Sequence, residues 1–549
     1  MKKQSNFYIY GITLVATLGG LLFGYDTAVV SGTTAALDNF FVKPLFSDPA
    51  AAISVVFQYK VIVSLCLAII IGLASDFLFK LFGSKKGLFY SALVIVPAII
   101  IWFTQFWNQP NDLTEAMASS IKGFVISSAL VGCIIGGAWG GLISSAIGRK
   151  NGLIIAAVLF IISAIGSALP DLLNFMQVEM VSSLIFYRII GGVGVGIASM
   201  LSPVYIAEVA PANMRGKLVS FNQFAIIFGM LVVYFVNYFI AKGGSDEWIN
   251  TIGWRWMFAS EVIPCVLFLG LLFFVPKTPR YLLLKGHDAQ ARKVLQHLYG
   301  EQEMEKEYKS IKSSLIEKNA PWLSFGGTVI IIGILLSFFQ QAVGINVVLY
   351  YAPEIFRTMG AGNDTALLQT IIVGIINLSF TVVAIMTVDR FGRKPLMIIG
   401  AVGMAISMFL MGTTFYMGYI GILTLICMLF YTASFAMSWG PVCWVLLSEI
   451  FPNSIRGALS IAVAAQWLSN LIVSWTFPMM NDNPMLTASF NHGFAYWIYG
   501  VMGVLAAVFV WGWVPETKGR TLEQIEKLWH KKNRTENKEA GVITEANVE

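Results

Sequence analysis

The sequence predicts an all-α polytopic membrane protein, and three observations carry that prediction. Hydrophobic residues make up 57% of the 549 positions and charged residues only 12%, about half the charged share of an ordinary soluble protein. The mean hydropathy is +0.74, so a soluble fold could not bury this much apolar surface. Apolar runs recur along the whole chain, each long enough for one helix to cross a bilayer core of about 30 Å. This composition excludes a soluble enzyme, a nucleic-acid-binding protein and a disordered scaffold.

Fourteen apolar runs are predicted to span the membrane. They are rich in Gly, Ala and Ser as well as Leu and Ile, which suits close helix packing in lipid. The first run follows Lys2 and Lys3 and is too long for the apolar core of a signal peptide, so we expect it to be retained. The runs extend over 8–32, 53–74, 87–107, 122–147, 152–169, 181–208, 217–241, 254–275, 323–351, 365–388, 395–417, 419–448, 458–480 and 493–514.

The loops between these runs differ in their basic residues, and this predicts the orientation of the chain. Residues 277–320 carry nine Lys and Arg against six Asp and Glu, and short basic segments occur at 148–151, 215–217 and 389–394. The connections at 170–180 and 481–492 contain no Lys or Arg. Cytoplasmic loops are enriched in Lys and Arg, so both termini and the long loop are predicted to be cytoplasmic, with the protein in the cell (inner) membrane.

The long basic loop divides the chain into two halves. We expect an N-terminal bundle at 1–275, which includes an apolar hairpin at about 53–107, and a C-terminal bundle at 323–514. Residues 276–322 are predicted to form a cytoplasmic linker of short amphipathic helices. A cytoplasmic tail is predicted at 515–549.

The two halves repeat each other in sequence. Three segments of the first half recur in the same order in the second half, at nearly constant offsets of 244, 241 and 239 positions. Parallel repeats of this kind are typical of transporters whose halves rock about a site near the membrane midplane. The matched pairs are AIGRK at 146–150 with RFGRK at 390–394, AEVAP at 207–211 with SEIFP at 448–452, and VPKT at 275–278 with VPET at 514–517.

Several longer motifs resemble those of the sugar porters of the major facilitator superfamily. They are GYDTAVVSG (24–32), YRIIGG (187–192), PKTPR (276–280), FQQAVGINVVLYYAPEIF (339–356), VDRFGRKP (388–395), SWGPVCWVLLSEIFP (438–452) and VPETKG (514–519). The resemblance implies the major facilitator fold, with two six-helix bundles in pseudo-twofold repeat. The runs 53–74 and 87–107 stand where the family usually has a short external loop. We expect them to form an inserted two-helix hairpin, and an external hydrophobic cap is the alternative.

Uncharged polar and aromatic side chains inside the predicted spans could bind a sugar, which needs many hydrogen bonds and flat apolar faces. An amide that faces lipid without a partner is costly, so these amides are expected to point inwards. Nine residues are candidates for this site. The resemblance implies that six of them, all except Phe23, Asn377 and Trp467, contact the sugar. We expect Tyr350 to line the outer gate. The alternative is that the amides only join neighbouring helices. The candidates are Phe23, Gln223, Gln340, Gln341, Asn346, Asn377, Trp444, Gln466 and Trp467.

Asp26 is the most informative single residue, because an ionised carboxylate in the middle of a span is expensive and usually functional. Arg188, in the run at 181–208, is its candidate partner. The resemblance implies proton coupling by this pair, since proton-coupled members have a carboxylate here and facilitators typically have an amide. Protonation of Asp26 would release Arg188 and change which packing of the halves is favoured. A purely structural ion pair is the alternative, and Glu261 is a weaker rival as proton carrier.

Charged residues at the cytoplasmic ends of the runs are expected to form a gate. The resemblance implies ion pairs between the halves that hold the inner side shut when the protein opens outwards. The alternative is that these charges only fix topology, which accounts for the basic residues but not for the repeated Glu. The residues are Arg149, Glu208, Arg215, Asp389, Arg393, Glu449 and Arg456.

The sequence contains no motif for a metal, a nucleotide or a catalytic centre, such as CxxC, HExxH or GxxxxGK[ST]. We therefore expect no enzyme activity, cofactor, metal or nucleic acid, and a lipid bilayer, a monosaccharide and a proton as partners of a monomer. Together with the resemblance, this predicts import of a monosaccharide in symport with a proton, with D-xylose as the leading substrate. An uncoupled facilitator, a proton symporter for glucose or a related sugar, and a non-transporting sugar sensor stay open as alternatives.

Overall fold

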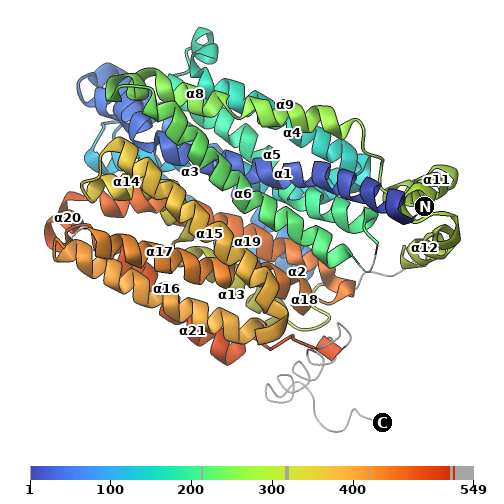
Figure 1. Cartoon of the computed structure of the whole chain (residues 1–549). Helices are drawn as coiled ribbons and strands as arrows, with labels where there is room; N and C mark the ends of the chain where they lie inside the picture. Colours follow the sequence, from blue (N-terminus) through green and yellow to red (C-terminus); the bar gives the residue numbers. More distant parts are fainter. Residues whose placement is uncertain are drawn as a thin grey trace.

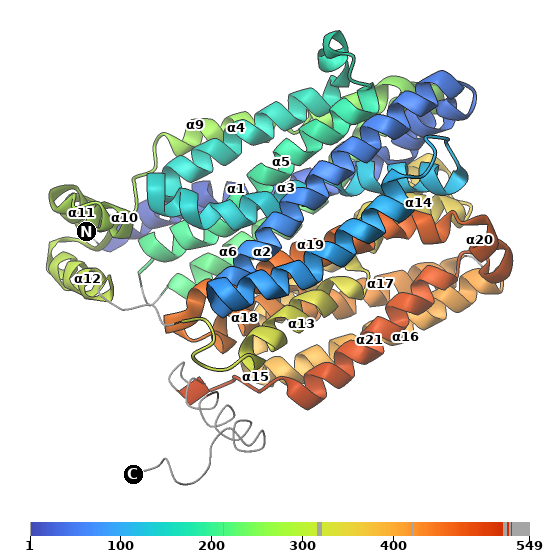
Figure 2. The ribbon, with the colours of Figure 1, turned by 180° about the vertical axis from the view of Figure 1, so that it is seen from behind.

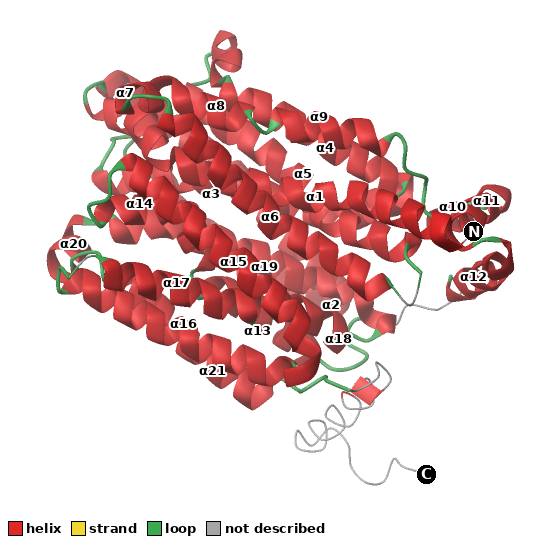
Figure 3. Cartoon of the chain, in the orientation of Figure 1, coloured by secondary structure: helices red, strands yellow, loops and turns green. Residues whose placement is uncertain are grey.

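The computed structural model describes residues 2–211, 214–315, 321–419, 421–519, 524–525 and 529. The described residues form helices joined by loops, with no strand among them (Figure 3). The long helices run side by side along one common direction (Figure 1). One end of the bundle, here termed the linker end, carries α10 (Pro279–Leu284), α11 (Asp288–Tyr299) and α12 (Glu301–Ser314). The opposite end, termed the distal end, carries the short helix α20 (Pro484–Phe490).

The N-terminal half, taken as the residues up to 275, supplies six long helical segments besides the hairpin. Two of them pack with their backbones in contact, since a Cβ atom on Gly192 would lie 1.7 Å from the carbonyl oxygen of Ala129. Such close approach is typical of helices that associate in lipid. The segments are α1 (Lys2–Leu37), α3 (Glu115–Ile147), α4 (Arg149–Ala168), α5 (Met180–Val209), α6 (Arg215–Lys242) and the run of α7, α8 and α9 (Asp246–Leu272).

The C-terminal half, from residue 323, contains six further spans, and two of these are broken. The predicted span 323–351 is interrupted at Gly344, where a φ of 90° places the backbone in the left-handed region that glycine tolerates. The predicted span 419–448 is interrupted at Ser438. The helices are α13 (Thr328–Ala342), α14 (Ile345–Thr358), α15 (Asn363–Phe391), α16 (Arg393–Tyr416), α17 (Ile422–Met437), α18 (Trp439–Ile450), α19 (Leu459–Asn481) and α21 (Phe494–Trp513).

The predicted hairpin is present as α2 (Pro49–Trp102), which doubles back on itself at Gly83 (Figure 2). Trp102 Nε1 donates to Ser64 Oγ at 3.0 Å, although an unbroken helix would separate these residues by about 57 Å. Gly83 has a φ of 76°, which permits the reversal. Thirteen helices of the described chain are long and apolar enough to span a membrane. One of the thirteen is the hairpin α2, which folds back and forms two limbs. The total therefore matches the fourteen predicted runs.

The turn of the hairpin is shorter than predicted. The two predicted runs are separated by residues 75–86, whereas the first limb stays helical up to Gly83. Asp76 and Lys80, four residues apart, form an ion pair of 2.6 Å on the helix surface, and such pairs support helices. Local helix stabilisation by polar residues therefore extends the limb beyond its apolar run.

The two halves are packed together towards the distal end. Helix α3 lies against α19, α1 against α14, and α6 against α15. Tyr234 on α6 donates to the carbonyl oxygen of Leu349 on α14 at 3.0 Å. Trp475 Nε1 on α19 donates to the carbonyl oxygen of Ser120 on α3, also at 3.0 Å. Backbone and side-chain contacts thus cross the interface between the halves at this end.

Candidate functional site

The break between α13 and α14 brings three predicted sugar-site amides into one chain of hydrogen bonds. Gln341 Nε2 donates to Gln340 Oε1 at 3.3 Å, and Asn346 Nδ2 donates to Gln341 Oε1. Gln340 Nε2 donates to the carbonyl oxygen of Trp439, at the start of α18, at 2.9 Å. In an unbroken helix, Gln341 and Asn346 would point about 140° apart around the axis. The left-handed Gly344 turns them towards each other.

An aromatic contact joins the halves near two buried polar atoms without partners. Phe23 on α1 lies against Trp467 on α19, with ring centroids 5.5 Å apart. Within the described residues, neither Trp467 Nε1 nor Oε1 of the adjacent Gln466 has a hydrogen-bond partner. Burying such a group unpaired costs free energy. Both atoms can therefore bond to a ligand that carries hydroxyl groups.

The other predicted sugar-site residues lie on three further helices. Gln223 on α6 and Trp444 on α18 are half-buried, and Asn377 on α15 is buried. No hydrogen bond between described side chains joins these three to the amide chain. Tyr350, expected at the outer gate, is buried on α14, which packs against α1 of the other half. The structure thus brings part of the predicted set into direct contact and distributes the rest over neighbouring helices.

Asp26 and Arg188 form a fully buried ion pair, as the sequence predicts. Arg188 Nη1 lies 2.8 Å from Asp26 Oδ1, and the two side chains are 2% and 0% exposed. Arg188 Nη2 also donates to the backbone carbonyl of Asp26 at 3.1 Å. Asp26 Oδ2 is buried without a partner among the described residues. Oδ1 of Asp26 is therefore bonded to Arg188, while Oδ2 can accept a proton.

Glu261 adds a second carboxyl group to this pair. It is 1% exposed at the junction of α8 and α9, and it interacts electrostatically with both Asp26 and Arg188. The cluster therefore contains two acids and one guanidinium, whose central carbon lies 5.6 Å from the ring centroid of Phe258. Among the described residues, no group of three or more His, Cys, Asp or Glu could hold a metal ion.

The gate residues at the linker end form ion pairs within each half. Arg149 Nη2 lies 2.7 Å from Glu208 Oε1 in the N-terminal half. Arg393 Nη2 lies 2.8 Å from Glu449 Oε1 in the C-terminal half. The two pairs occupy matching positions of the internal repeat, so the repeat is visible in the contacts as well as in the sequence. The predicted pairing between the halves belongs to the state that opens outwards, and these contacts within each half leave it a prediction.

Of the other three predicted gate residues, the structure describes the side chain of only one. Arg215, the first residue of α6, is exposed. The side chains of Asp389 and Arg456 lie outside the part of the chain that the structure describes.

An ion-pair site at the distal end has no counterpart in the sequence predictions. Lys122 on α3 contacts Glu354 on α14 and Asp482 after α19, and of the ion pairs between described side chains only these two join the halves. The available signal is a lysine in the first position of the predicted run 122–147. Because Lys122 stands at the edge of that run, the sequence indicates only that it marks the end of a membrane span.

Comparison with known proteins identifies the family. The family model described as sugar (and other) transporter matches residues 12–529, which is nearly the whole chain. The chain belongs to the sugar (and other) transporter family. The resemblance noted from the sequence motifs is confirmed by this match.

Curated relatives in this family are transporters of several sugars. The chain is 54% identical to the D-xylose-proton symporter of Escherichia coli, over 96% of this chain and 97% of the relative. It is 37% identical to the glucose facilitated diffusion protein of Zymomonas mobilis, over 96% and 98%. It is 36% identical to the arabinose-proton symporter of Bacillus subtilis, over 96% and 97%.

Solved structures of the xylose transporter from Escherichia coli share the fold. The inward-open conformation aligns with a TM-score of 0.74 at 53% identity and covers 95% of this chain and 100% of that chain. The proton:xylose symporter of the major facilitator superfamily bound to 6-bromo-6-deoxy-D-glucose aligns with a TM-score of 0.72 at 54% identity, covering 96% and 100%. The predicted major facilitator fold is therefore confirmed.

Proposed function

We propose that this chain imports a monosaccharide together with a proton by alternating access, and that D-xylose is its substrate. The observation that carries the proposal is the buried Asp26–Arg188 pair, in a chain 54% identical to a D-xylose-proton symporter. A carboxylate without solvent exposure is expensive in lipid and is usually functional. The unpartnered Oδ2 of Asp26 supports a role in proton uptake and release.

The sugar would bind between the halves, against the amide chain and the Phe23–Trp467 contact. Side-chain amides donate and accept hydrogen bonds, as sugar hydroxyl groups do. Gln340, Gln341 and Asn346 are already aligned by their mutual hydrogen bonds, so little side-chain freedom is lost on binding. Gln223, Asn377, Trp444 and Gln466 would complete the site from other helices.

Proton coupling would follow from the charge balance of the buried cluster. With both acids ionised, Asp26 and Glu261 carry two negative charges against the single positive charge of Arg188. The cluster is neutral only when it holds one proton, and a buried uncompensated charge is costly. A proton on Asp26 weakens its hold on Arg188 and so changes the relative free energies of the two packings of the halves. The membrane potential then supplies about 2.3 kcal/mol per proton per 100 mV.

The rocking bodies would be the N-terminal bundle (1–275) and the C-terminal bundle (323–514), joined by the linker at 276–322. We assign the linker end to the cytoplasm, with both termini, in the inner membrane, because that end carries the basic loops. In this assignment the distal end faces outwards. Because the halves are joined there, the structure is closed to the outside. Closure of the linker end would exchange the pairs Arg149–Glu208 and Arg393–Glu449 for pairs between the halves, with Arg215, Asp389 and Arg456 as further members. We further propose that the transporter acts as a monomer.

Uptake into sealed vesicles under an imposed pH gradient tests the coupling. Wild-type protein should concentrate labelled D-xylose, whereas Asp26→Asn should bind and exchange the sugar without concentrating it. The matched control is Asp171→Asn, which removes a carboxylate paired with Arg255 at the distal surface and should concentrate xylose like wild type. If Asp26→Asn concentrates xylose as well as wild type does, proton coupling through Asp26 is refuted.

The same assay separates the alternative functions. The relative from Zymomonas mobilis is a facilitated diffusion protein, and an uncoupled carrier would equilibrate sugar without concentrating it. A symporter for glucose would concentrate glucose in preference to xylose in a competition experiment. A sugar sensor would bind sugar and move none.

A further inference from the structure

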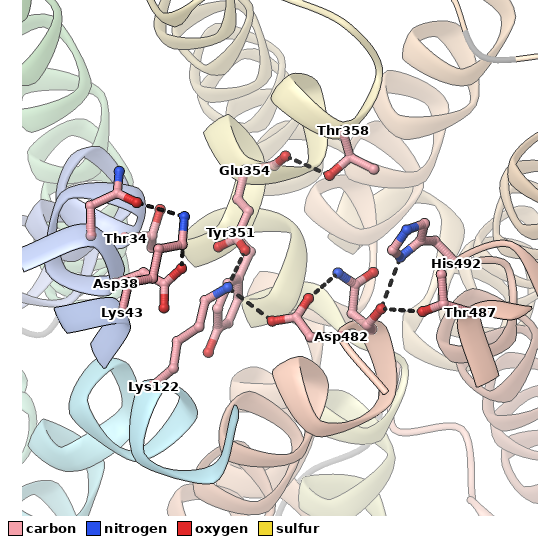
Figure 4. Close-up of polar contacts among 12 residues, drawn as sticks. Thr34, Asp38, Lys43, Lys122, Tyr351, Glu354, Thr358, Asp482, Thr487 and His492 are labelled. Carbon is pink, nitrogen blue, oxygen red and sulfur yellow. Dashed lines mark hydrogen bonds and ion pairs between the residues drawn. The ribbon is translucent and has the colours of Figure 1, made fainter. Parts of the chain in front are cut away.

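Lys122 contacts two carboxylates of the opposite half at the distal end (Figure 4). Its Nζ atom lies 2.5 Å from Glu354 Oε1 and 2.9 Å from Asp482 Oδ2. Lys122 stands near the start of α3, whereas Glu354 is on α14 and Asp482 directly follows α19. One ammonium group therefore holds together three helices from both halves.

The two carboxylates are fixed to one another through the C-terminal half. Tyr351, which neighbours Glu354 in the region of Figure 4, donates through its hydroxyl to the carbonyl oxygen of Ser474 on α19 at 2.8 Å. Asn481 Nδ2 donates to Asp482 Oδ1 at 2.8 Å. The carbonyl oxygen of Asn481 in turn accepts from Thr487 and His492. Glu354 and Asp482 thus form a preorganised acceptor that moves with the C-terminal half.

The contact is largely removed from water. The side chains of Lys122, Glu354 and Asp482 are 10%, 18% and 30% exposed. Asp482 also lines a distal cavity of about 600 Å³ between the hairpin, α3 and α20. Screening by water and salt is weak for such partly buried charges. Separating them takes from the ammonium the two carboxylates of its ion pairs and leaves only the more weakly interacting Asp38 of its own half. The pairs therefore favour the packing in which the halves touch at this end.

We propose that Lys122 is the latch of the distal gate, a positioning residue whose two ion pairs exist only while that gate is closed. Opening the distal end separates α3 from α14 and α19, and so breaks both pairs at once. The latch then sets the balance between the two packings. The proposal rests on alternating access and is independent of the identity of the sugar and of proton coupling.

A distance measurement across the distal end tests the latch without sugar or a pH gradient. Cysteines introduced by Phe175→Cys and Met485→Cys, at sites 82% and 77% exposed on the two halves, carry spin labels. The five native cysteines are all buried. Wild type should show mainly the short distance. Lys122→Met should raise the share of the long distance at least about tenfold, which corresponds to about 1.4 kcal/mol.

The matched control is Lys43→Met, because Lys43 pairs with Asp38 and Asn39 of its own half and should leave the distances unchanged. If Lys122→Met fails to fold, the isosteric triple variant Lys122→Met, Glu354→Gln, Asp482→Asn decides, since it removes the ammonium together with both carboxylates of its ion pairs. An unchanged distance distribution in the variant that folds overturns the latch, as does an equal shift in Lys43→Met. Failure of the vesicle assay for proton coupling would leave this measurement intact.

Discussion

Three buried polar atoms without partners lie on residues of the predicted sugar and proton sites. Asp26 Oδ2, Trp467 Nε1 and Gln466 Oε1 are such atoms among the described residues. Folded proteins pair nearly all their buried polar groups, because each unpaired one costs about 1–3 kcal/mol. These atoms lie on α1 and α19, which contact each other across the interface through Phe23 and Trp467. Unpaired hydrogen-bonding atoms therefore lie on helices that meet at the interface between the halves.

Replacement of Trp467 by Phe separates a binding role of its indole from a structural one. The change keeps an aromatic ring next to Phe23 and removes an N–H group that has no partner. We expect sugar affinity to fall about threefold to tenfold, since one hydrogen bond is worth about 0.5–1.5 kcal/mol. The melting temperature should fall only slightly, because the smaller ring fills less of a buried position. Calorimetric titration and thermal unfolding measure the two effects. A lower melting temperature with unchanged affinity would contradict the assignment.

At the scale of the elements, breaks in helices place the functional groups. The left-handed Gly344 aligns Gln341 with Asn346, and the break at Ser438 lies beside Trp439, whose carbonyl oxygen accepts from Gln340. Transporters commonly build their sites from such discontinuous helices. The amide chain is therefore a product of two helix breaks.

Gly344→Ala should disturb the site more than a comparable change elsewhere. Its φ of 90° disfavours a side chain, and a Cβ atom there would lie 2.7 Å from the ring of Tyr499. Gly360, at the end of α14, has a φ of 88° but no atom within 4 Å of a new Cβ atom. We expect Gly344→Ala to reduce sugar affinity about tenfold or more, and Gly360→Ala to leave it near wild type at a cost of about 1 kcal/mol in stability. Equal affinities in both variants would show that the break does not position the amides.

A carboxylate cap at the start of α16 gives a pH-dependent prediction. Glu516 accepts hydrogen bonds from the backbone N–H groups of Arg393 and Lys394 at 3.1 and 3.0 Å, and from the next two residues of its own segment. Partial burial of the carboxyl acts to raise the pKa of Glu516, but the four N–H donors outweigh it and the pKa is lowered. The cap therefore stabilises the fold above the unfolded carboxyl pKa of about 4.3 and loses this effect as the pH falls through the lowered value.

Thermal unfolding of Glu516→Gln measures this effect. We expect a loss of about 0.5–2 kcal/mol at pH 7 and a progressively smaller loss in acid, as the pH falls through the lowered pKa of Glu516 and the wild-type carboxyl is protonated as well. Asp112→Asn is the control, because Asp112 is exposed and its side chain makes no hydrogen bond with described residues. A loss that stays the same throughout the acid titration would show that the charge of Glu516 is not what stabilises α16.

For the whole molecule, the two ends of the bundle oppose each other. The distal end is joined by Lys122, whereas the linker-end ion pairs between described side chains lie within one half or the other. A charged contact made in only one packing biases the equilibrium towards that packing. In our proposal, alternating access is a competition between the ion pairs of Lys122 at the distal end and the pairs that would form between the halves at the linker end.

Loss of the linker-end arginines should reverse the effect of losing the latch. Adding Arg149→Gln and Arg393→Gln to Lys122→Met removes the charges proposed to close the linker end. We expect the spin-label distance across the distal end to return to the short value. Arg292→Gln, which removes an arginine that pairs with Glu305 inside the linker, should have no such effect in the same background. A distance that stays long would contradict a gating role for Arg149 and Arg393.

The sequence predicts much of the architecture because lipid leaves few choices. A span must be helical, apolar and about 20 residues long, so the fourteen limbs and the hairpin follow from counting. A mid-span acid must find a partner, so the Asp26–Arg188 pair is also predictable. The latch at Lys122 is not, because its partners Glu354 and Asp482 are 232 and 360 positions away. The cap by Glu516 likewise joins residues more than 120 positions apart.

By itself, the sequence determined the span count, the internal repeat and the buried acid–guanidinium pair. The span count and the pair follow from the cost of placing polar groups in lipid, and the repeat follows from matching segments of the two halves. Only the tertiary structure decided that Glu261 joins this pair, that two breaks align the amides, and that the linker-end pairs stay within each half. These features depend on which helix faces come together, and hydrophobicity is too similar along all the helices to specify that.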